Sequence, residues 1–293
     1  MSGPHLRWQA ILLGLCMGVP ATAGAAVGCA IGATAPQGTY TADNALVLDG
    51  SFTVTCTRSA TDPQAVPLYI GVNQPPTGRE MTPQSGSDRL PYGLYRTRPD
   101  LGLWTDGPGT TDGSPATGGL LVELDFASPG NLVAQRVVPF YAYVPAGLNR
   151  QVGWYQDAAV PVSVRQASAD GALLASTLLS VSARIADQCR ITPPPGPLVI
   201  SYTAFMATAA QCSALFDVTC TLGTAFTIAL DPPSATMDTV DISYQLSLDA
   251  ADGQGSAQAQ TYRITGTAAP GQRGRCAGGV CRASRTHSIV VSY

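Results

Sequence analysis

The sequence has 293 residues, a formal net charge of −3 and only 12% charged residues. All sixteen basic residues are Arg. This sparse, slightly acidic charge excludes the basic footprint of a nucleic-acid-binding protein and the polybasic patch of a membrane-surface protein. After the first 25 residues, no apolar run approaches the roughly 20 residues that a membrane-spanning helix needs.

The first 25 residues have the pattern of a secretory signal peptide. Arg7 precedes an apolar run over residues 10–19, and small residues follow as far as Ala25. This pattern predicts export, with cleavage after Ala25. Cys29 then comes so soon that no strand fits before it.

Seven cysteines remain after such a cleavage: Cys29, Cys56, Cys189, Cys212, Cys220, Cys276 and Cys281. In an exported chain, this number indicates disulfides. Metal binding is the alternative, but His287 is the only mature histidine and no close CxxC pair exists. For Cys29, lipidation is a further alternative, because the preceding residues loosely resemble a lipobox, although the expected Leu or Val is missing.

Short stretches of alternating apolar and polar residues predict strands throughout the chain. They cover residues 51–56, 67–72, 137–144, 160–164, 173–185, 225–230 and 288–293. No amphipathic helix of useful length appears. The predicted class is therefore all-β, built as sandwiches.

The segment 173–185 has the longest alternation. Its odd positions can fill a core while most even positions face water. Those odd positions are Leu173, Ala175, Thr177, Leu179, Val181, Ala183 and Ile185.

An internal repeat divides the mature chain. A Cys, an apolar stretch, a Tyr-Thr-Ala and a second Cys occur at Cys29, Tyr40 and Cys56, and again at Cys189, Tyr202 and Cys220. The repeat predicts two related domains, 26–186 and 187–293, with Cys29–Cys56 and Cys189–Cys220 as equivalent disulfides. Cys276 and Cys281 are expected to close a short loop. Cys212 is left over, either as a small buried hydrophobe, which we favour, or as an alternative partner for Cys189.

Nothing in the sequence favours catalysis. His287 lies beside the last predicted strand, without a recognisable nucleophile and orienting group. Five aspartates precede Gly, as turn residues do: Asp49, Asp106, Asp112, Asp170 and Asp252. Asp106 and Asp112 lack the spacing of a calcium loop. We expect no enzyme activity, cofactor or bound metal.

The motifs resemble those of the spore coat U domain family, which also occurs in subunits of archaic (Csu-type) chaperone–usher pili. In the first half they are residues 78–81, 90–95, 104–107 and 153–157. In the second half they are residues 262–266, the Cys276/Cys281 loop and residues 286–293. The second half has only part of the Tyr-x-Leu-Tyr motif, so its middle strands are less well defined.

This resemblance implies two immunoglobulin-like β-sandwich domains, the C-terminal one missing its last strand. A donor strand from a neighbouring subunit would fill the open groove, along an edge that includes Ile289, Val291 and Tyr293. The first domain would instead be closed in cis by residues 173–185, which lie where a polymerising pilin carries its donor strand.

The implied function is that of a tip adhesin or tip-located minor subunit, which attaches to surfaces and supports biofilm formation. It implies export to the periplasm and then display on a surface pilus. The implied partners are a periplasmic pilus chaperone, an outer-membrane usher and the next pilin subunit; nucleic acid is not among them. The alternative is a secreted coat-type protein of the same fold that does not polymerise.

The sequence does not define the surface or host ligand, but several apolar residues are candidates for adhesive loops: Leu101, Leu103, Trp104 and Leu148. For Trp104 we favour a core position, because it belongs to a family motif. Residues 120–126 are either a buried strand or part of a binding finger. Arg96, Arg98 and Arg150 could serve anionic ligands, but we favour a place on the solvated surface for them.

Overall fold

The computed structural model describes residues 27–75, 77–97, 101–111, 114, 116–276 and 278–293. The regular structure of these residues consists of strands, which confirms the all-β class. In this part of the chain there is no helix with the length and hydropathy to cross a membrane. The predicted signal peptide over residues 1–25 lies outside the described residues.

The N-terminal half forms a sandwich of eleven strands, which we call the first sandwich. The strands are β1 (Gly28–Ala33), β2 (Gln37–Tyr40), β3 (Leu46–Thr57), β4 (Ala65–Val72), β5 (Arg79–Pro83), β6 (Leu90–Thr97), β7 (Leu101–Thr111), β8 (Gly118–Asp125), β9 (Val133–Val144), β10 (Gly153–Gln166) and β11 (Leu173–Ile185). One layer runs β1-β3-β9-β6 and the other runs β8-β4-β10-β11-β2, while β7 pairs with β6 and β8 and so joins the two layers.

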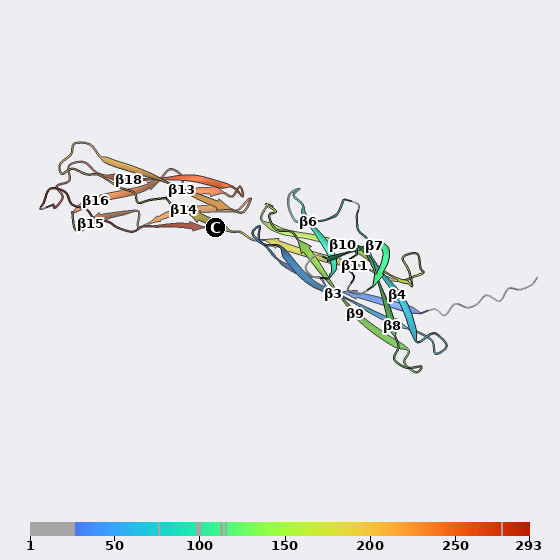
Figure 1. Cartoon of the computed structure of the whole chain (residues 1–293). Helices are drawn as coiled ribbons and strands as arrows, with labels where there is room; N and C mark the ends of the chain where they lie inside the picture. Colours follow the sequence, from blue (N-terminus) through green and yellow to red (C-terminus); the bar gives the residue numbers. More distant parts are fainter. Residues whose placement is uncertain (1–26, 76, 98–100, 112–113, 115, 277) are drawn as a thin grey trace, which may run out of the picture.

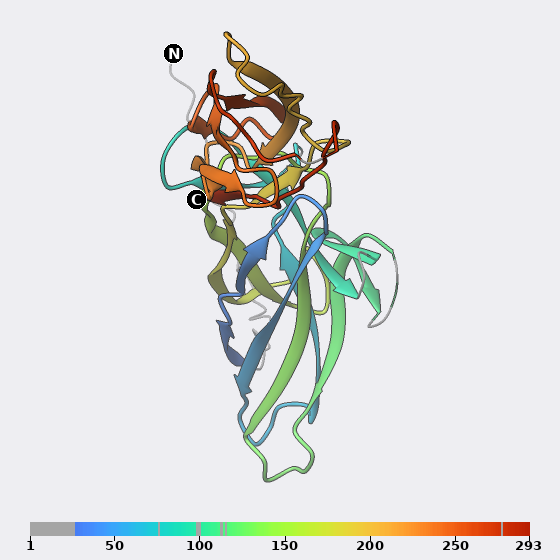
Figure 2. The same cartoon turned by 90° about the vertical axis from the view of Figure 1, so that its left-hand side faces the viewer.

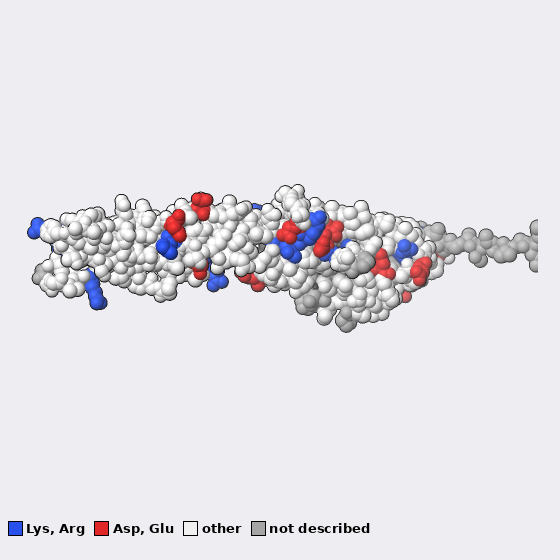
Figure 3. All heavy atoms as spheres, turned by 90° about the horizontal axis from the view of Figure 1, so that it is seen from above, with Lys and Arg blue, Asp and Glu red and all other residues white. Residues whose placement is uncertain are grey.

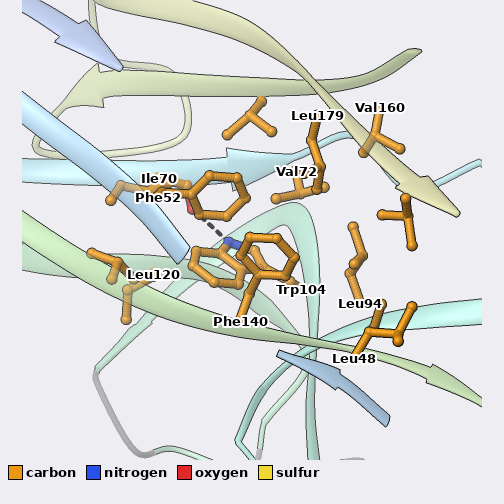
Figure 4. Close-up of a cluster of buried hydrophobic side chains, with 14 of the residues drawn as sticks. Leu48, Phe52, Ile70, Val72, Leu94, Trp104, Leu120, Phe140, Val160 and Leu179 are labelled. Carbon is orange, nitrogen blue, oxygen red and sulfur yellow. Dashed lines mark hydrogen bonds between the residues drawn. The ribbon is translucent and has the colours of Figure 1, made fainter. Parts of the chain in front are cut away.

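Trp104 lies at the centre of this core (Figure 4). It is fully buried, and its Nε1 donates a hydrogen bond to the carbonyl oxygen of Ile70 at 2.9 Å. Its ring meets Phe52 edge-on at 5.4 Å, and Phe52 stacks on Phe140 at 4.6 Å. Because β3, β4, β7 and β9 all contribute to this cluster, it holds the two layers together.

Strand β11 occupies an inner position of its layer. It pairs antiparallel with β10 along most of its length and parallel with β2 at its end. Four of its odd positions are buried, namely Leu179, Val181, Ala183 and Ile185.

The alternation of β11 does not extend to its beginning. A register shift in the β10–β11 ladder separates Val164 from Arg165. It leaves Leu173 exposed, while Leu174 and Ala175 pack against the core. Thr177 is only half-buried. The expected inward position of Leu173 is therefore wrong, because the bulge turns the first residues of the strand over.

The C-terminal half forms two smaller sheets, which we call the second sandwich. The strands are β12 (Cys189–Thr192), β13 (Ala210–Cys220), β14 (Ala225–Asp231), β15 (Ser234–Met237), β16 (Ile242–Leu248), β17 (Asp252–Gln254), β18 (Ala259–Ala268) and β19 (Ser288–Ser292). One sheet has the order β12-β13-β18-β16-β15 and the other β17-β14-β19. Figures 1 and 2 show the two groups of strands as separate units joined by a short connection.

The disulfides confirm the three expected pairs. Cys29 is bonded to Cys56, and the two residues are direct cross-strand partners on β1 and β3. Cys189 and Cys220 hold the same relation on β12 and β13. Cys276 is bonded to Cys281. The cysteine frame is therefore repeated in structure as well as in sequence, and the lipid alternative for Cys29 is not realised here.

Cys212 is the one free cysteine among the described residues. It is half-buried on β13, with its Sγ 4.0 Å from the carbonyl oxygen of Gly266, and burial raises the pKa of its thiol. The alternative pairing with Cys189 is excluded, because Cys189 is bonded to Cys220.

Candidate functional site

The free edge of β19 is the most distinctive feature of the second sandwich. Strand β19 pairs with β14 on one side, and none of the described residues forms a ladder with its other side. Its backbone N–H and C=O groups on that side are available to another strand. Ile289 and Val291 point inward and are half-buried, while Val290 points outward and is 42% exposed.

The first sandwich shows what fills the equivalent position there. Strand β4 follows the second cysteine of its repeat and pairs with β10, just as β14 follows Cys220 and pairs with β19. On the far side of β10 lies β11, and beyond it lies β2, which ends at Tyr40. In the second sandwich, the stretch that ends at Tyr202 corresponds to β2 but forms no strand. Both neighbours of β11 therefore have counterparts in the second sandwich, but β11 itself has none among the described residues.

The apolar interior beside this edge is incompletely covered. In the cluster that includes Ile289 and Val291, seven residues are buried and eight more apolar residues are only partly buried. In the first sandwich, thirty residues are buried and eight are partly buried. Leu198 is one of those partly buried residues, and Ile200 is partly buried against a second, smaller cluster; both lie in the irregular stretch before Tyr202. A strand with alternating apolar residues would cover them, at a gain of about 25 cal/mol per Å² of apolar surface removed from water.

His287 fixes the start of β19. Its Nδ1 lies 2.7 Å from the carbonyl oxygen of Pro232 and donates to it, because that oxygen can only accept. Its Nε2 then accepts a hydrogen bond from the hydroxyl of Tyr244. The histidine has a structural role here, since both ring nitrogens are used to hold the edge strand.

The three edge residues expected from the sequence are placed differently from one another. Ile289 and Val291 lie on β19 with their side chains toward the core. Tyr293 follows the strand and is 61% exposed, so it does not line the interior. Its assignment to the edge is wrong, because the strand ends at Ser292.

The four candidate adhesive residues differ in how far their side chains are exposed. Leu101 and Leu103 belong to strand β7, Leu101 being 50% exposed and Leu103 half-buried. Trp104 is fully buried, so an adhesive role for it is excluded and the favoured core position is correct. Leu148 packs against the core from the turn after β9. Of the four residues, only Leu101 offers a mainly exposed apolar side chain.

The structure corrects the expectation for Arg96 and decides between the two alternatives for residues 120–126. Arg96 is 5% exposed, not solvated, because its guanidinium donates to the hydroxyl of Thr110 and to carbonyl oxygens between residues 111 and 116. Residues 118–125 form β8, with most apolar side chains buried, so the stretch is a strand and not a binding finger. Arg98 and Asp112 lie outside the described residues, in which no cluster of metal-ligating side chains occurs.

Sequence reasoning missed the contribution of residues 198–202 to the open groove. The repeated Tyr-Thr-Ala after Tyr40 and Tyr202 carried the signal. Aligning the two repeats on these tyrosines places Ile200 at the position of Gly38 in β2, and Leu198 at the position of Pro36, just before β2 begins.

Of three comparisons with known proteins, one found a family, one found a similar structure and one found no match. Residues 17–161 match the family described as Spore Coat Protein U domain. No curated protein matches the chain.

Among solved structures, one similar chain comes from the structure titled "Crystal structure of CsuC-CsuE chaperone-tip adhesion subunit pre-assembly complex from archaic chaperone-usher Csu pili of Acinetobacter baumannii". It is 16% identical, with a TM-score of 0.46, over 89% of this chain and 100% of that chain. From the match of the family model, residues 17–161, which include β1 to β9 and the first part of β10, belong to the Spore Coat Protein U domain family.

Proposed function

We propose that this protein is a subunit of an archaic chaperone–usher pilus that sits at the pilus tip and acts by binding, not by catalysis. The observation that carries the proposal is the difference between the two repeats. In the first sandwich, β11 lies between β10 and β2, whereas in the second the equivalent place beside β19 is open among the described residues. A unit of the second kind can accept a strand from another chain.

The first sandwich supports a terminal position. Its first described strand, β1, is paired with β3 and bonded to it through Cys29 and Cys56. Its last strand, β11, is paired on both sides. Strand β1 contains the first cysteine of the first repeat, and β11 precedes the first cysteine of the second repeat. Both strands are paired within the first sandwich, so the described residues leave no strand free to donate.

The partners follow from this arrangement. A periplasmic chaperone would supply a temporary strand to the β19 edge, an outer-membrane usher would export the complex, and the donor strand of the next subunit would replace the chaperone's. We propose 26–186 as the outward-facing adhesin domain, closed in cis by residues 173–185, and 187–293 as the pilin domain. Surface attachment and biofilm formation are the functions we assign to the outward-facing domain.

The test supplies the absent strand in cis. Strand β10 continues into β11 through residues 167–172, so a copy of residues 167–185 is appended after Tyr293 in the full chain. It can then fold back along β19 as β11 folds back along β10. We expect the second sandwich to unfold at a higher midpoint, which circular dichroism measures. We also expect the extended chain to aggregate less, which light scattering measures.

A matched control carries Asp at the positions of Leu179 and Val181 in the appended copy only. It has the same length and turn but cannot enter an apolar groove, so it should behave like the unextended chain. An unextended chain that is already monomeric, with a second sandwich that the appended strand does not stabilise, would contradict the open-groove proposal. That outcome would favour the secreted coat-type alternative.

A further inference from the structure

The segment that joins β18 to β19, residues 269–287, concentrates positive charge. Four of the six arginines of the second sandwich lie in it and are exposed: Arg273, Arg275, Arg282 and Arg285. The sequence between Asp252 and Tyr293 contains no acidic residue. In a chain with only 12% charged residues, this segment is a distinct surface, which we call the arginine loop.

The arginine loop is exposed but firmly held. The side-chain amide of Gln272 accepts a hydrogen bond from the N–H of Ser243 at 2.7 Å and donates one to the carbonyl oxygen of Ser243 at 2.9 Å. The N–H of Arg275 donates to the carbonyl oxygen of Val240 at 2.7 Å, and a disulfide closes the tip of the loop. A surface that is held in this way loses little conformational entropy when a partner binds it.

Little of this charge is neutralised by nearby carboxylates. The turn between β15 and β16 supplies Asp238 and Asp241, and Asp241 forms an ion pair with Arg275 at 3.6 Å in which both side chains are more than half exposed. The Arg285 guanidinium donates to the carbonyl oxygen of Thr236, which leaves its charge in place. On the face drawn in Figure 3, the end of the second sandwich farthest from the first shows basic and no acidic side chains. The loop therefore favours an acidic partner.

The direction of β19 sets the position of the loop relative to the open edge. Strand β14 starts beside the first sandwich, since the carbonyl oxygen of Leu222, in the turn before it, accepts a hydrogen bond from the N–H of Val152 at 2.9 Å. Strand β19 runs antiparallel to β14, so it starts at the far end, just after the arginine loop, and ends near the first sandwich (Figure 1).

This direction also fixes which part of a partner meets the loop. A strand that fills the edge of β19 as β11 fills that of β10 would run antiparallel to β19. It would enter beside Ser292 and leave beside Ser288. Whatever follows that strand in the donor chain would therefore emerge at the arginine loop.

We propose that the arginine loop binds an acidic surface of the subunit whose strand fills the β19 edge, in the part of that subunit that follows the strand. Val280, which is 87% exposed at the tip of the loop, adds an apolar contact. The inference rests on the proposed function, because it needs an open edge that accepts a strand. It adds the charge of the partner and the place of contact.

The test uses the full chain and two synthetic peptides with the same fluorescent label. Both contain the sequence of residues 173–185, which fills the equivalent place in the first sandwich. One has three aspartates added after the position of Ile185, and the other has them before that of Leu173, so the two have equal composition and net charge. Only the first peptide brings its aspartates to the arginine loop.

We expect the first peptide to bind about fivefold more tightly at low salt, as fluorescence anisotropy measures, because exposed ion pairs add modest amounts each. The difference should shrink in about 0.5 M NaCl, which screens exposed charges.

The variant for this test combines Arg273→Gln with Arg282→Gln. It removes two charges and keeps the two arginines whose contacts hold the loop, so the difference between the peptides should fall below about twofold. The matched control combines Arg190→Gln with Arg263→Gln, which removes two exposed arginines on β12 and β18 and should leave the difference unchanged. Circular dichroism checks that each variant is folded.

Equal binding of the two peptides, or a preference that persists without Arg273 and Arg282, would overturn this inference and leave the open groove intact. A preference for the peptide with leading aspartates would overturn it as well, because the strand would then run in the other direction. If neither peptide binds, the open groove is itself contradicted, and the inference falls with it.

Discussion

Tyr202 makes in the second sandwich the same pair of contacts that Tyr40 makes in the first. The Tyr40 hydroxyl accepts a hydrogen bond from the backbone N–H of Leu148 and donates one to the carbonyl oxygen of Pro145, both at 2.9 Å. The Tyr202 hydroxyl accepts from the N–H of Gln272 at 2.7 Å and donates to its carbonyl oxygen at 3.4 Å. Each tyrosine therefore anchors a distant turn, which gives the repeated Tyr-Thr-Ala a structural reason.

The Tyr40 anchor predicts a measurable loss of stability. Tyr40→Phe keeps the buried ring and leaves the N–H of Leu148 and the carbonyl of Pro145 without this partner. We expect the free energy of unfolding of the first sandwich to fall by about 1–3 kcal/mol in chemical denaturation. Tyr293→Phe, at an exposed position, is the control and should change nothing. An unchanged midpoint for Tyr40→Phe would mean that water replaces the hydroxyl without cost.

The sequence was sufficient to predict the repeat, the disulfides and most strands, because these features depend on local patterns. Cys29 and Cys56 end up as direct cross-strand partners, as their equal placement in the two repeats indicated. Alternation over residues 225–230 and 288–293 likewise predicted β14 and β19, apart from the terminal Tyr293.

The errors concern features that depend on tertiary packing. Arg96 looked like a surface residue because an arginine in a polar stretch usually is one, but here backbone carbonyls far along the chain surround its guanidinium. Leu173 was predicted to face inward because a strict period of two was extended through a bulge. A hollow lined by Asn73, Gln74, Leu103 and Asp106 could not be predicted, because it lies between the end of β4 and the middle of β7, whose connection through β8 the sequence does not reveal.

The stability of the first sandwich should depend on the shape of the Arg58 guanidinium. Arg58 is 6% exposed, lies 5.1 Å from the centre of the Phe126 ring, and donates to the carbonyl oxygens of Asp62, Ser128, Pro129 and Asn131. A lysine has one nitrogen and cannot reach all four. We expect Arg58→Lys to lower the free energy of unfolding by about 1–3 kcal/mol and to speed proteolysis within residues 128–131.

Arg184→Lys is the control for this prediction, since Arg184 is exposed on β11. It should leave both the unfolding curve and the cleavage rate unchanged. Equal behaviour of the two variants would show that the charge of Arg58, and not its set of donors, is what matters.

The three disulfides should contribute unequally to the free energy of unfolding. The sequence separations of 27 and 31 residues for Cys29–Cys56 and Cys189–Cys220 correspond to about 3–4 kcal/mol each in the chain-entropy model. The separation of 5 residues for Cys276–Cys281 implies a smaller contribution. Replacing both cysteines of a pair by serine should therefore cost more for either long-loop pair than for Cys276–Cys281, as measured by chemical denaturation. Cys212→Ser breaks no disulfide and should cost less than the long-loop pairs, and non-reducing peptide mapping checks the pairing itself.

The most direct test of the first sandwich compares two neighbouring leucines of β11. Leu179 is 1% exposed and Leu178 is 63% exposed, although both lie in the same ladder with β10. If β11 fills the core of its own sandwich, Leu179→Asp places a charge in an apolar interior and should abolish the cooperative unfolding transition of the first sandwich, at a cost above about 4 kcal/mol.

Leu178→Asp makes the same chemical change on the outer face of the same strand, so it controls for strand propensity and for added charge. It should leave the transition close to that of the unaltered chain. Leu173→Asp should also be tolerated, because the bulge leaves Leu173 exposed. If Leu179→Asp keeps a native transition by circular dichroism and tryptophan fluorescence, β11 is not the strand that closes the sandwich. The proposed division between a closed first unit and an open second unit would then lose its basis.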